Sequence, residues 1–411
     1  MSIRVLVVDD SALMRQMISR FLTEAGMEVV ATARDGVEGL EKALALRPDV
    51  VTLDVEMPRM DGLTMLGRLM EEAPIPVVMV SSVTQRQAPA TIEALMLGAV
   101  DVVAKPGGSI SVNLGDVREE LIAKVRAASR AQVRPRRGRA PSDGPSVLRA
   151  APETGAARER APAAPASTPG RALNGAPAAG LRSAPARSPV LERQEEPLAP
   201  ERGQAPEAEA PPRRKPGTAP GPGPVVVGSS TGGPSALSTL LGGLPADFPR
   251  PVIVVQHMPE GFTASLARRL DGLSPLKVAE AEPGHVPKPG EAWVARGGQH
   301  LVFDPEGRMV LSSAAPHLGV RPAVDLTLES AVDVWGGDVV AVILTGMGMD
   351  GARGARKLKR VGGKVLAQDE ASSVVYGMPR VVTELKLVDE VHSLSEMAAA
   401  LVRIVQETAA P

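Results

Sequence analysis

Short, almost wholly apolar runs recur towards both ends of the chain, and each stops abruptly at small, polar or charged residues. In the N-terminal third, five such runs alternate with stretches that have the apolar spacing of helices, including 12–25 and 37–46. The five runs are residues 3–8, 29–33, 50–53, 76–80 and 99–104. Alternation of buried strands with helices predicts a parallel sheet with right-handed crossovers.

The same pattern returns from Pro224 onward. Residues 225–227 predict a buried strand that passes directly into a glycine-rich turn and a helix at 234–241. Residues 339–344 form a fully apolar and therefore central strand. Further predicted elements are a strand at 251–256, a helix at 321–334 and short strands at 293–295, 300–303 and 309–312. We expect the last three to form an antiparallel addition to a second parallel sheet.

Between these regions, from about Ala131 to Gly223, the chain consists mainly of Pro, Ala, Arg, Gly and Glu, with very few large apolar residues. Such a composition cannot bury enough apolar surface to offset the loss of chain entropy on folding. The sequence therefore predicts three parts: a domain at 1–128, a disordered linker at 129–223 and a second domain at 224–411.

Composition narrows the possible functions. The 411 residues carry 46 Lys and Arg against 47 Asp and Glu, so no broad positive charge favours nucleic acid or an anionic membrane as a partner. The absence of cysteine excludes disulfides, thiolate metal sites and a cysteine nucleophile. Aromatic residues make up only 2%, which disfavours a base-stacking surface. Because no signal-peptide pattern precedes the first strand and no apolar run reaches about 18 residues, we expect a soluble, cytoplasmic protein.

Polar groups follow the predicted strands of the N-terminal domain. Asp9 and Asp10 follow the first strand, and Asp54 follows the third. Since open α/β sheets bind ligands at the carboxyl edge, these carboxylates should converge, and a hard cation such as Mg²⁺ would relieve their repulsion. Ser81 and Lys105 follow the next two strands, where a hydroxyl and an ammonium can hold a phosphoryl group on Asp54. Any one of these residues alone is better explained as a helix cap or a surface group, but five at strand ends are not.

The turn at residues 228–232 reads Gly-Ser-Ser-Thr-Gly and matches the G-x-S-x-G pattern. Its glycines allow a sharp bend that presents Ser230 at the end of a strand, so Ser230 is a candidate nucleophile. A glycine-rich loop that holds a phosphate at the N-terminus of the next helix explains the same residues. The turn alone leaves both interpretations open.

Two residues farther along the chain favour the nucleophile. His257 follows the strand at 251–256, and Asp350 lies in a glycine-rich turn after the strand at 339–344. At one sheet edge, Asp350 would orient the imidazole of His257, which would take the proton of Ser230. The chain order Ser, His, Asp differs from the order in α/β-hydrolases, so the motif does not by itself indicate that fold. The other histidines are expected at the surface or in turns: His285, His300, His317 and His392.

Residues 1 to about 128 resemble the receiver domain of two-component response regulators, and residues 53–62 (LDVEMPRMDG) match the phosphorylation-site signature of that family. The resemblance implies a flavodoxin-like fold. The implied site residues are a phosphorylated Asp54, Mg²⁺ held by Asp9, Asp10 and Asp54, a switch hydroxyl at Ser81 and a phosphoryl contact at Lys105. Many receivers carry an aromatic switch residue where this chain has Val102.

From about Pro224, the chain resembles the catalytic domain of the chemotaxis protein-glutamate methylesterases. The resemblance rests on residues 228–233 (GSSTGG), 256–259 (QHMP), 321–325 (RPAVD), 344–351 (LTGMGMDG) and 376–379 (YGMP). It implies a Rossmann-like domain in which Ser230 is the nucleophile, His257 the base and Asp350 its orienting acid. Thr231 and the Met347 backbone amide are further candidates around the histidine and the oxyanion. The linker is much longer than the short connector usual in this family.

Together, the two resemblances imply a phosphorylation-activated serine esterase of chemotaxis adaptation. Its substrates would be glutamate methyl esters on methyl-accepting chemoreceptors, through which it would meet the membrane, and it would also deamidate receptor glutamines. A chemotaxis histidine kinase would supply the phosphoryl group, and ester hydrolysis would need no cofactor. Two alternatives stay open: the same ester chemistry in a receptor system outside motility, and a non-catalytic signalling module that binds a nucleotide or partner through its glycine loop.

Overall fold

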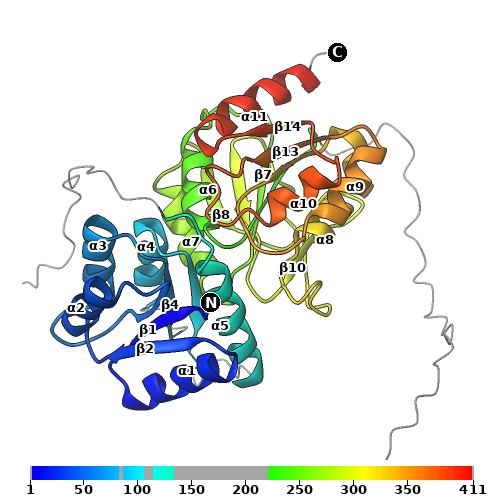
Figure 1. Ribbon diagram of the computed structural model, residues 1–411. Coiled ribbons are helices and arrows are strands. Elements are labelled where there is room, and N and C mark those ends of the chain that lie inside the picture. Colours follow the sequence, from blue (N-terminus) through cyan, green and yellow to red (C-terminus); the bar gives the residue numbers. More distant parts are fainter. Residues whose placement is uncertain (1, 83–86, 106–113, 134–220, 410–411) are drawn as a thin grey trace, which may run out of the picture. The chain divides into compact units, whose positions relative to one another are not determined.

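The structure is a computed structural model that describes residues 2–82, 87–105, 114–133 and 221–409 (Figure 1). These residues build two parallel sheets with helices and a small antiparallel sheet, whereas most of the predicted linker at 129–223 lies outside the described residues. No helix in the described part combines the length and the apolar character needed to cross a membrane.

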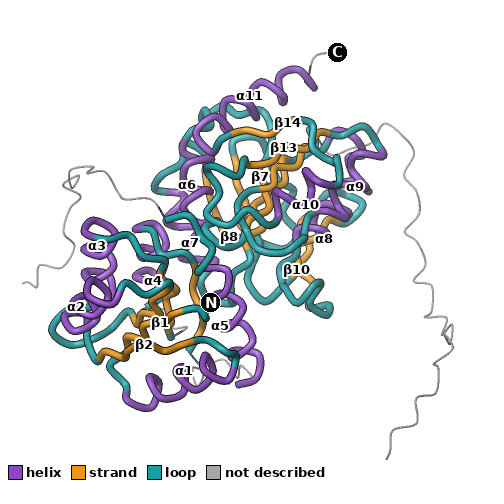
Figure 2. Tube along the Cα trace, viewed as in Figure 1, coloured by secondary structure: helices purple, strands orange, loops and turns teal. Residues whose placement is uncertain are grey.

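The N-terminal sheet has five parallel strands in the order β2-β1-β3-β4-β5. Its elements are β1 (Arg4–Val8), α1 (Ala12–Glu24), β2 (Glu28–Ala33), α2 (Gly36–Leu46), β3 (Val50–Asp54), α3 (Gly62–Glu72), β4 (Val77–Ser81), α4 (Ala88–Leu97), β5 (Asp101–Ala104) and α5 (Leu114–Ala128). Alternate residues of β1 face opposite sides: Val5 and Val7 pack with α1 and α5, and Leu6 and Val8 pack with α2, α3 and α4. Helices therefore cover both faces, as the strand and helix pattern predicts (Figure 2).

The C-terminal sheet has seven strands in the order β14-β13-β12-β6-β7-β9-β8, and every pairing is parallel. Its strands are β6 (Val225–Ser229), β7 (Val252–Gln256), β8 (Lys277–Glu280), β9 (Glu291–Val294), β12 (Val340–Ile343), β13 (Lys364–Gln368) and β14 (Glu390–His392). Its helices are α6 (Gly233–Gly242), α7 (Thr263–Asp271), α8 (Val324–Trp335), α9 (Ala352–Arg360), α10 (Met378–Glu384) and α11 (Leu394–Ala409). The chain runs outward from β6 through β7 and later returns to β12 on the other side. The switch point of the sheet, where open α/β sheets bind ligands, thus lies beside β6.

The predicted antiparallel addition differs in two details. Trp293 lies in β9, which pairs in parallel with β7 and with β8, a strand that the sequence analysis did not predict. Strands β10 (His300–Phe303) and β11 (Met309–Ser312) do pair antiparallel, but they form a sheet of their own. This small sheet packs against α8 instead of pairing with another strand. Thr327 Oγ1 of α8 donates a hydrogen bond to Leu301 O of β10 (2.7 Å). The Phe303 ring also meets the edge of Trp335, with the ring centroids 5.0 Å apart.

Candidate functional site

Ser230 lies in the turn between β6 and α6, and its main chain is held on both sides. Its N–H donates to Thr345 O beyond β12 (3.0 Å), and its carbonyl accepts from Gly233 N–H (2.8 Å). Gly232 has φ of +78°, in the left-handed region that glycine adopts without strain. The turn therefore has one defined path from strand to helix.

The side chain of Gln256, at the end of β7, is a part of the site that the sequence analysis missed. Its amide nitrogen donates to Ser230 O (2.9 Å) and to His257 O (3.0 Å), and its oxygen accepts from Ser229 Oγ (2.7 Å). A Cβ on Gly233 would lie 1.9 Å from this oxygen, so only glycine fits there. Gln256 thus joins the ends of β6 and β7, and its place in the Gln-His-Met-Pro segment was the available signal.

His257 follows β7 directly, beside Ser230. Ser229 and Gln256 are opposite each other in the parallel pair of β6 and β7. Ser230 follows Ser229 and His257 follows Gln256, so these two residues leave the sheet side by side. The imidazole Nε2 donates to Asp350 Oδ2 at 2.8 Å. Within the described residues, neither Ser230 Oγ nor His257 Nδ1 has a hydrogen-bond partner. A ring that donates from Nε2 keeps a lone pair on Nδ1, which is then available to accept a proton.

Asp350 is 3% exposed and lies at the N-terminus of α8. Its carboxylate accepts the N–H groups of Val324 (2.6 Å), Asp325 (2.9 Å) and Gly351 (2.9 Å) in addition to the His257 ring. Burial opposes its charge, but the His257 contact and the backbone N–H groups outweigh burial, so the pKa of Asp350 lies below its ordinary value. The group is therefore a carboxylate that can orient a histidine and stabilise its protonated form.

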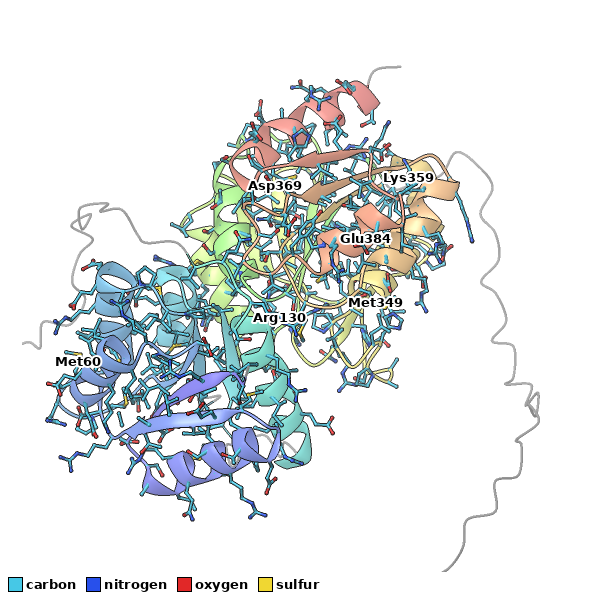
Figure 3. All side chains as sticks on the ribbon, viewed as in Figure 1. Met60, Arg130, Met349, Lys359, Asp369 and Glu384 are labelled. Atoms are coloured by element: carbon cyan, nitrogen blue, oxygen red, sulfur yellow. The ribbon has the colours of Figure 1, made fainter. Side chains whose placement is uncertain are left out.

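The loop from Thr345 to Asp350 brings its glycine against the Ser230 turn. A Cβ on Gly346 would lie 2.7 Å from Ser230 Cβ, so the absence of a side chain permits the approach. Met347 and Met349 are 41% and 53% exposed, which places the middle of the loop at the surface (Figure 3). Within the described residues, the Met347 N–H has no acceptor, so it is free to meet an oxyanion.

Within the described residues, the Thr231 hydroxyl donates its hydrogen bond to a carboxylate and not to His257. The described residues of both sheets belong to one compact unit, and in it Thr231 Oγ1 donates to Asp101 Oδ2 of β5 (2.6 Å). The next residue, Gly232, donates its N–H to Val100 O (3.0 Å). The turn that carries Ser230 is thus bonded to the strand that precedes Lys105.

The carboxylates predicted to converge in the N-terminal sheet do so. One oxygen from each of Asp9, Asp10 and Asp54 lies within 4.8 Å of the others, and Lys105 Nζ lies 2.8 Å from Asp9 and 2.7 Å from Asp54. Burial raises the pKa of Asp54 to about 6, although Lys105 acts in the opposite direction. Burial lowers the pKa of Lys105, but its contacts with the two buried carboxylates outweigh this and leave its pKa raised. Three oxygen donors of this kind fit Mg²⁺.

Ser81 and Val102 complete this edge. Ser81 is 1% exposed, and its Oγ accepts a hydrogen bond from Thr91 Oγ1 at the start of α4 (2.8 Å). Val102 is buried in β5. Beside it, the buried Asp101 pairs with the partly buried Lys124 of α5 at 3.0 Å, so the carboxylate that accepts from Thr231 also belongs to an ion pair.

Comparison with known proteins finds a match in each of the two parallel-sheet regions of the chain. The family model for the response regulator receiver domain matches residues 5–111, and the model for the CheB methylesterase matches residues 225–401. A protein-glutamate methylesterase/protein-glutamine glutaminase of Symbiobacterium thermophilum is 47% identical over 406 residues, which cover 98% of each chain. A protein of the same name from Geobacillus kaustophilus is 43% identical over 415 residues and 99% of each chain. The crystal structure of the Thermotoga maritima CheB methylesterase catalytic domain is 45% identical, covers 45% of this chain and 99% of its own, and has a TM-score of 0.44.

The chain has a receiver sheet with an acidic edge, and a second sheet with serine, histidine and aspartate at its switch point. This combination defines a response regulator whose output domain is an enzyme. The two relatives match this chain over almost their whole length. The chain belongs to the protein-glutamate methylesterase/protein-glutamine glutaminase family, with a methylesterase domain as its output enzyme.

Proposed function

We propose that this protein hydrolyses glutamate methyl esters on methyl-accepting chemoreceptors, deamidates receptor glutamines, and is activated by phosphorylation of Asp54. The observation that carries the proposal is the His257–Asp350 pair at the switch point of the sheet, beside the hydroxyl of Ser230, which is without a hydrogen-bond partner among the described residues. The whole-length identity to protein-glutamate methylesterase/protein-glutamine glutaminases supports the substrate class.

In the proposed reaction, Ser230 Oγ attacks the ester carbonyl while His257 Nδ1 accepts its proton. Asp350 remains ionised and stabilises the imidazolium, and the Met347 N–H donates to the oxyanion. Collapse of the tetrahedral intermediate breaks the bond to the methoxy oxygen, which takes the proton from His257 and leaves as methanol. Water then attacks the glutamyl ester of Ser230, gives its proton to His257 and releases glutamate as the serine recovers its proton.

The same groups account for deamidation. A glutamine side chain presents a carbonyl of similar size to the oxyanion site, and the leaving group becomes ammonia once His257 protonates it. The acyl-enzyme is then the same glutamyl ester, and its hydrolysis yields glutamate. One site therefore serves both substrates.

Control by phosphorylation is proposed from the contacts of β5. Lys105, at the end of this strand, holds the acceptor Asp54, and Asp101, at its start, accepts the hydroxyl of Thr231 next to Ser230. A phosphoryl group on Asp54 would recruit Lys105 and Ser81, and a shift of β5 would loosen the contact with the Ser230 turn. Mg²⁺, held by Asp9, Asp10 and Asp54, would neutralise charge during phosphoryl transfer.

We expect methanol release from a methylated receptor to rise about tenfold when the full chain receives a small phosphodonor with Mg²⁺, within the usual range of coupling between sites. Asp54→Asn is the control and should keep the basal rate without the increase. The measurement is a methanol assay on a panel of methylated receptors. An equal increase in the Asp54→Asn protein would disprove control through Asp54, and the absence of methanol with every receptor would disprove the substrate assignment.

The pKa of Asp54 gives a second expectation. Because burial raises this pKa to about 6, protons compete with Mg²⁺ for the carboxylate, and Mg²⁺ affinity should fall about tenfold between pH 7 and pH 5. Isothermal titration calorimetry on the full chain measures this change. In Asp54→Asn the change centred near pH 6 should be absent. Wild-type affinity that stays constant from pH 7 to pH 5 would contradict the assignment of Asp54 as a buried Mg²⁺ ligand.

A further inference from the structure

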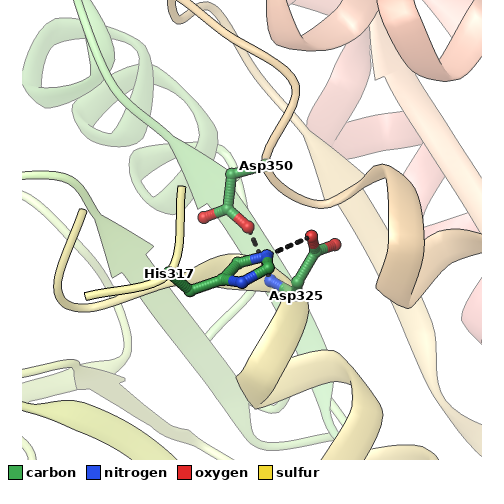
Figure 4. A group of neighbouring side chains, drawn as sticks. All are labelled: His317, Asp325 and Asp350. Carbon is green, nitrogen blue, oxygen red and sulfur yellow. Dashed lines mark hydrogen bonds and ion pairs between the residues drawn. The ribbon is translucent and has the colours of Figure 1, made fainter. Parts of the chain in front are cut away.

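A second histidine lies beside the acid of the proposed triad. His317 comes from the loop between β11 and α8, and its Nε2 donates to Asp325 Oδ2 at 2.9 Å (Figure 4). One ring nitrogen of His317 and one carboxylate oxygen from each of Asp325 and Asp350 lie within 4.8 Å of one another. The proposed reaction gives neither His317 nor Asp325 a role.

Asp325 connects three parts of the site. It is 1% exposed and is the second residue of α8. Its backbone N–H donates to Asp350 Oδ1 (2.9 Å), and its Oδ1 accepts the N–H of Gly354 in α9 (2.8 Å). Any tilt of the Asp325 residue would therefore displace a donor of Asp350, which in turn holds His257.

The two buried carboxylates repel each other and must each be compensated. Asp350 has three backbone N–H groups and the His257 ring. Asp325 has the N–H of Gly354, and within the described residues His317 is its only side-chain donor. Without that donor, one oxygen of the buried Asp325 carboxylate would lack a hydrogen-bond partner. The free-energy cost of an unpaired buried charge is large enough to move the carboxylate towards solvent.

The loop presents the His317 ring in a defined position. His317 and Val320 exchange two backbone hydrogen bonds of 3.1 and 3.0 Å around a two-residue turn. The two turn residues, Leu318 and Gly319, have φ of +51° and +80°. Arg321 also donates to Ala314 O (2.9 Å), which fixes the loop base. The contact with Asp325 is thus made by a preorganised group, not by a free side chain.

We propose that His317 is a positioning residue of the esterase: by holding the Asp325 carboxylate, it fixes the first turn of α8, and thereby Asp350 and His257, in the reactive arrangement. The inference rests on the proposed function of Ser230, His257 and Asp350. Within the described residues, His317 has no hydrogen bond to Ser230 or His257.

The test compares His317→Leu, which cannot donate, with His317→Gln, whose amide nitrogen reaches a position similar to that of Nε2 and donates without a charge. The control is His285→Leu, because His285 makes a comparable 2.9 Å contact with Glu291 that is not part of the proposed site. For each full-length protein, we would measure kcat and KM on methylated receptor, the rate of Ser230 labelling by a fluorophosphonate, and thermal stability.

We expect His317→Leu to lower both kcat and the labelling rate about tenfold or more, with KM within about twofold of wild type, since small displacements of catalytic groups have such effects. His317→Gln should recover both rates to within about threefold, and His285→Leu should match wild type. Unchanged rates in His317→Leu, a change confined to KM, or failure of His317→Gln to recover would each overturn the inference. A wild-type protein that is neither labelled nor active would instead overturn the proposed function on which the inference rests.

Discussion

Alanine in place of Ser230 is expected to lower hydrolysis of receptor methyl esters by at least about 10⁴-fold, because removal of a nucleophile that acts with its base as one unit has effects of this size. The fold should be unaffected. Ser230 Oγ has no hydrogen bond to lose within the described residues, and the main chain of the turn is held by Thr345, Gly233 and Gln256. Methanol release measures the activity, and thermal unfolding measures the fold.

Ser238→Ala is a matched control, because in the described part of the chain the Ser238 hydroxyl donates only to Ser235 O within α6 (2.8 Å). This variant should keep wild-type turnover and should still be labelled by a fluorophosphonate, whereas Ser230→Ala should not be labelled. Turnover retained in Ser230→Ala would remove the nucleophile assignment. Nucleotide binding without any labelling of the wild-type protein would favour the alternative of a non-catalytic signalling module.

The convergence of distant residues could be predicted from the sequence because parallel strands end at a common edge. Ser230, His257 and Asp350 each follow an apolar run, and the register of β6 with β7 and β12 brings the ends of these runs together. The same reasoning placed Asp9 and Asp54 correctly in the N-terminal sheet. A pattern of strand ends therefore predicts which residues share an edge, although it does not give their hydrogen bonds.

The hydrogen bonds that the sequence did not predict join segments whose spacing along the chain follows no regular apolar pattern. His300 was expected at the surface or in a turn, but it is fully buried at the start of β10, where the hairpin packs on α8. His317 has no helical or strand periodicity around it, so its contact with Asp325 was not predicted. Likewise, no rule of local sequence links Thr231 to Asp101, which lies 130 residues away. Tertiary packing, and not the secondary-structure propensity of the local sequence, determines which residues form such pairs.

Asparagine in place of Asp350 is expected to lower kcat about 10³- to 10⁴-fold with a smaller effect on KM, as when a triad carboxylate is replaced by an amide. The carboxylate oxygens accept from Val324, Asp325, Gly351 and the His257 ring, and an amide has only one oxygen. Its NH₂ group must therefore face a donor. If it faces His257, the ring must present its lone pair to the amide and carry its proton on Nδ1, where it can no longer accept from Ser230.

The control for this substitution is Asp389→Asn. Asp389 also accepts a backbone N–H, from Val365 (2.8 Å), and pairs with Lys359 (2.7 Å), and its pKa is likewise lowered, with burial opposed by these contacts.

Because both pKa values are depressed, both carboxylates contribute stability above the ordinary Asp range near pH 4, and this contribution is lost as the pH falls through the folded-state pKa. Both variants should therefore unfold more easily at pH 7 than wild type, with a smaller difference in acid: Asp350→Asn by about 1–3 kcal/mol, and Asp389→Asn by less, because Asp389 is exposed and its charge is screened by solvent. Only Asp350→Asn should lose turnover. Equal losses of turnover in the two variants would show that Asp350 acts through stability alone, and the proposed orientation of His257 would then be wrong.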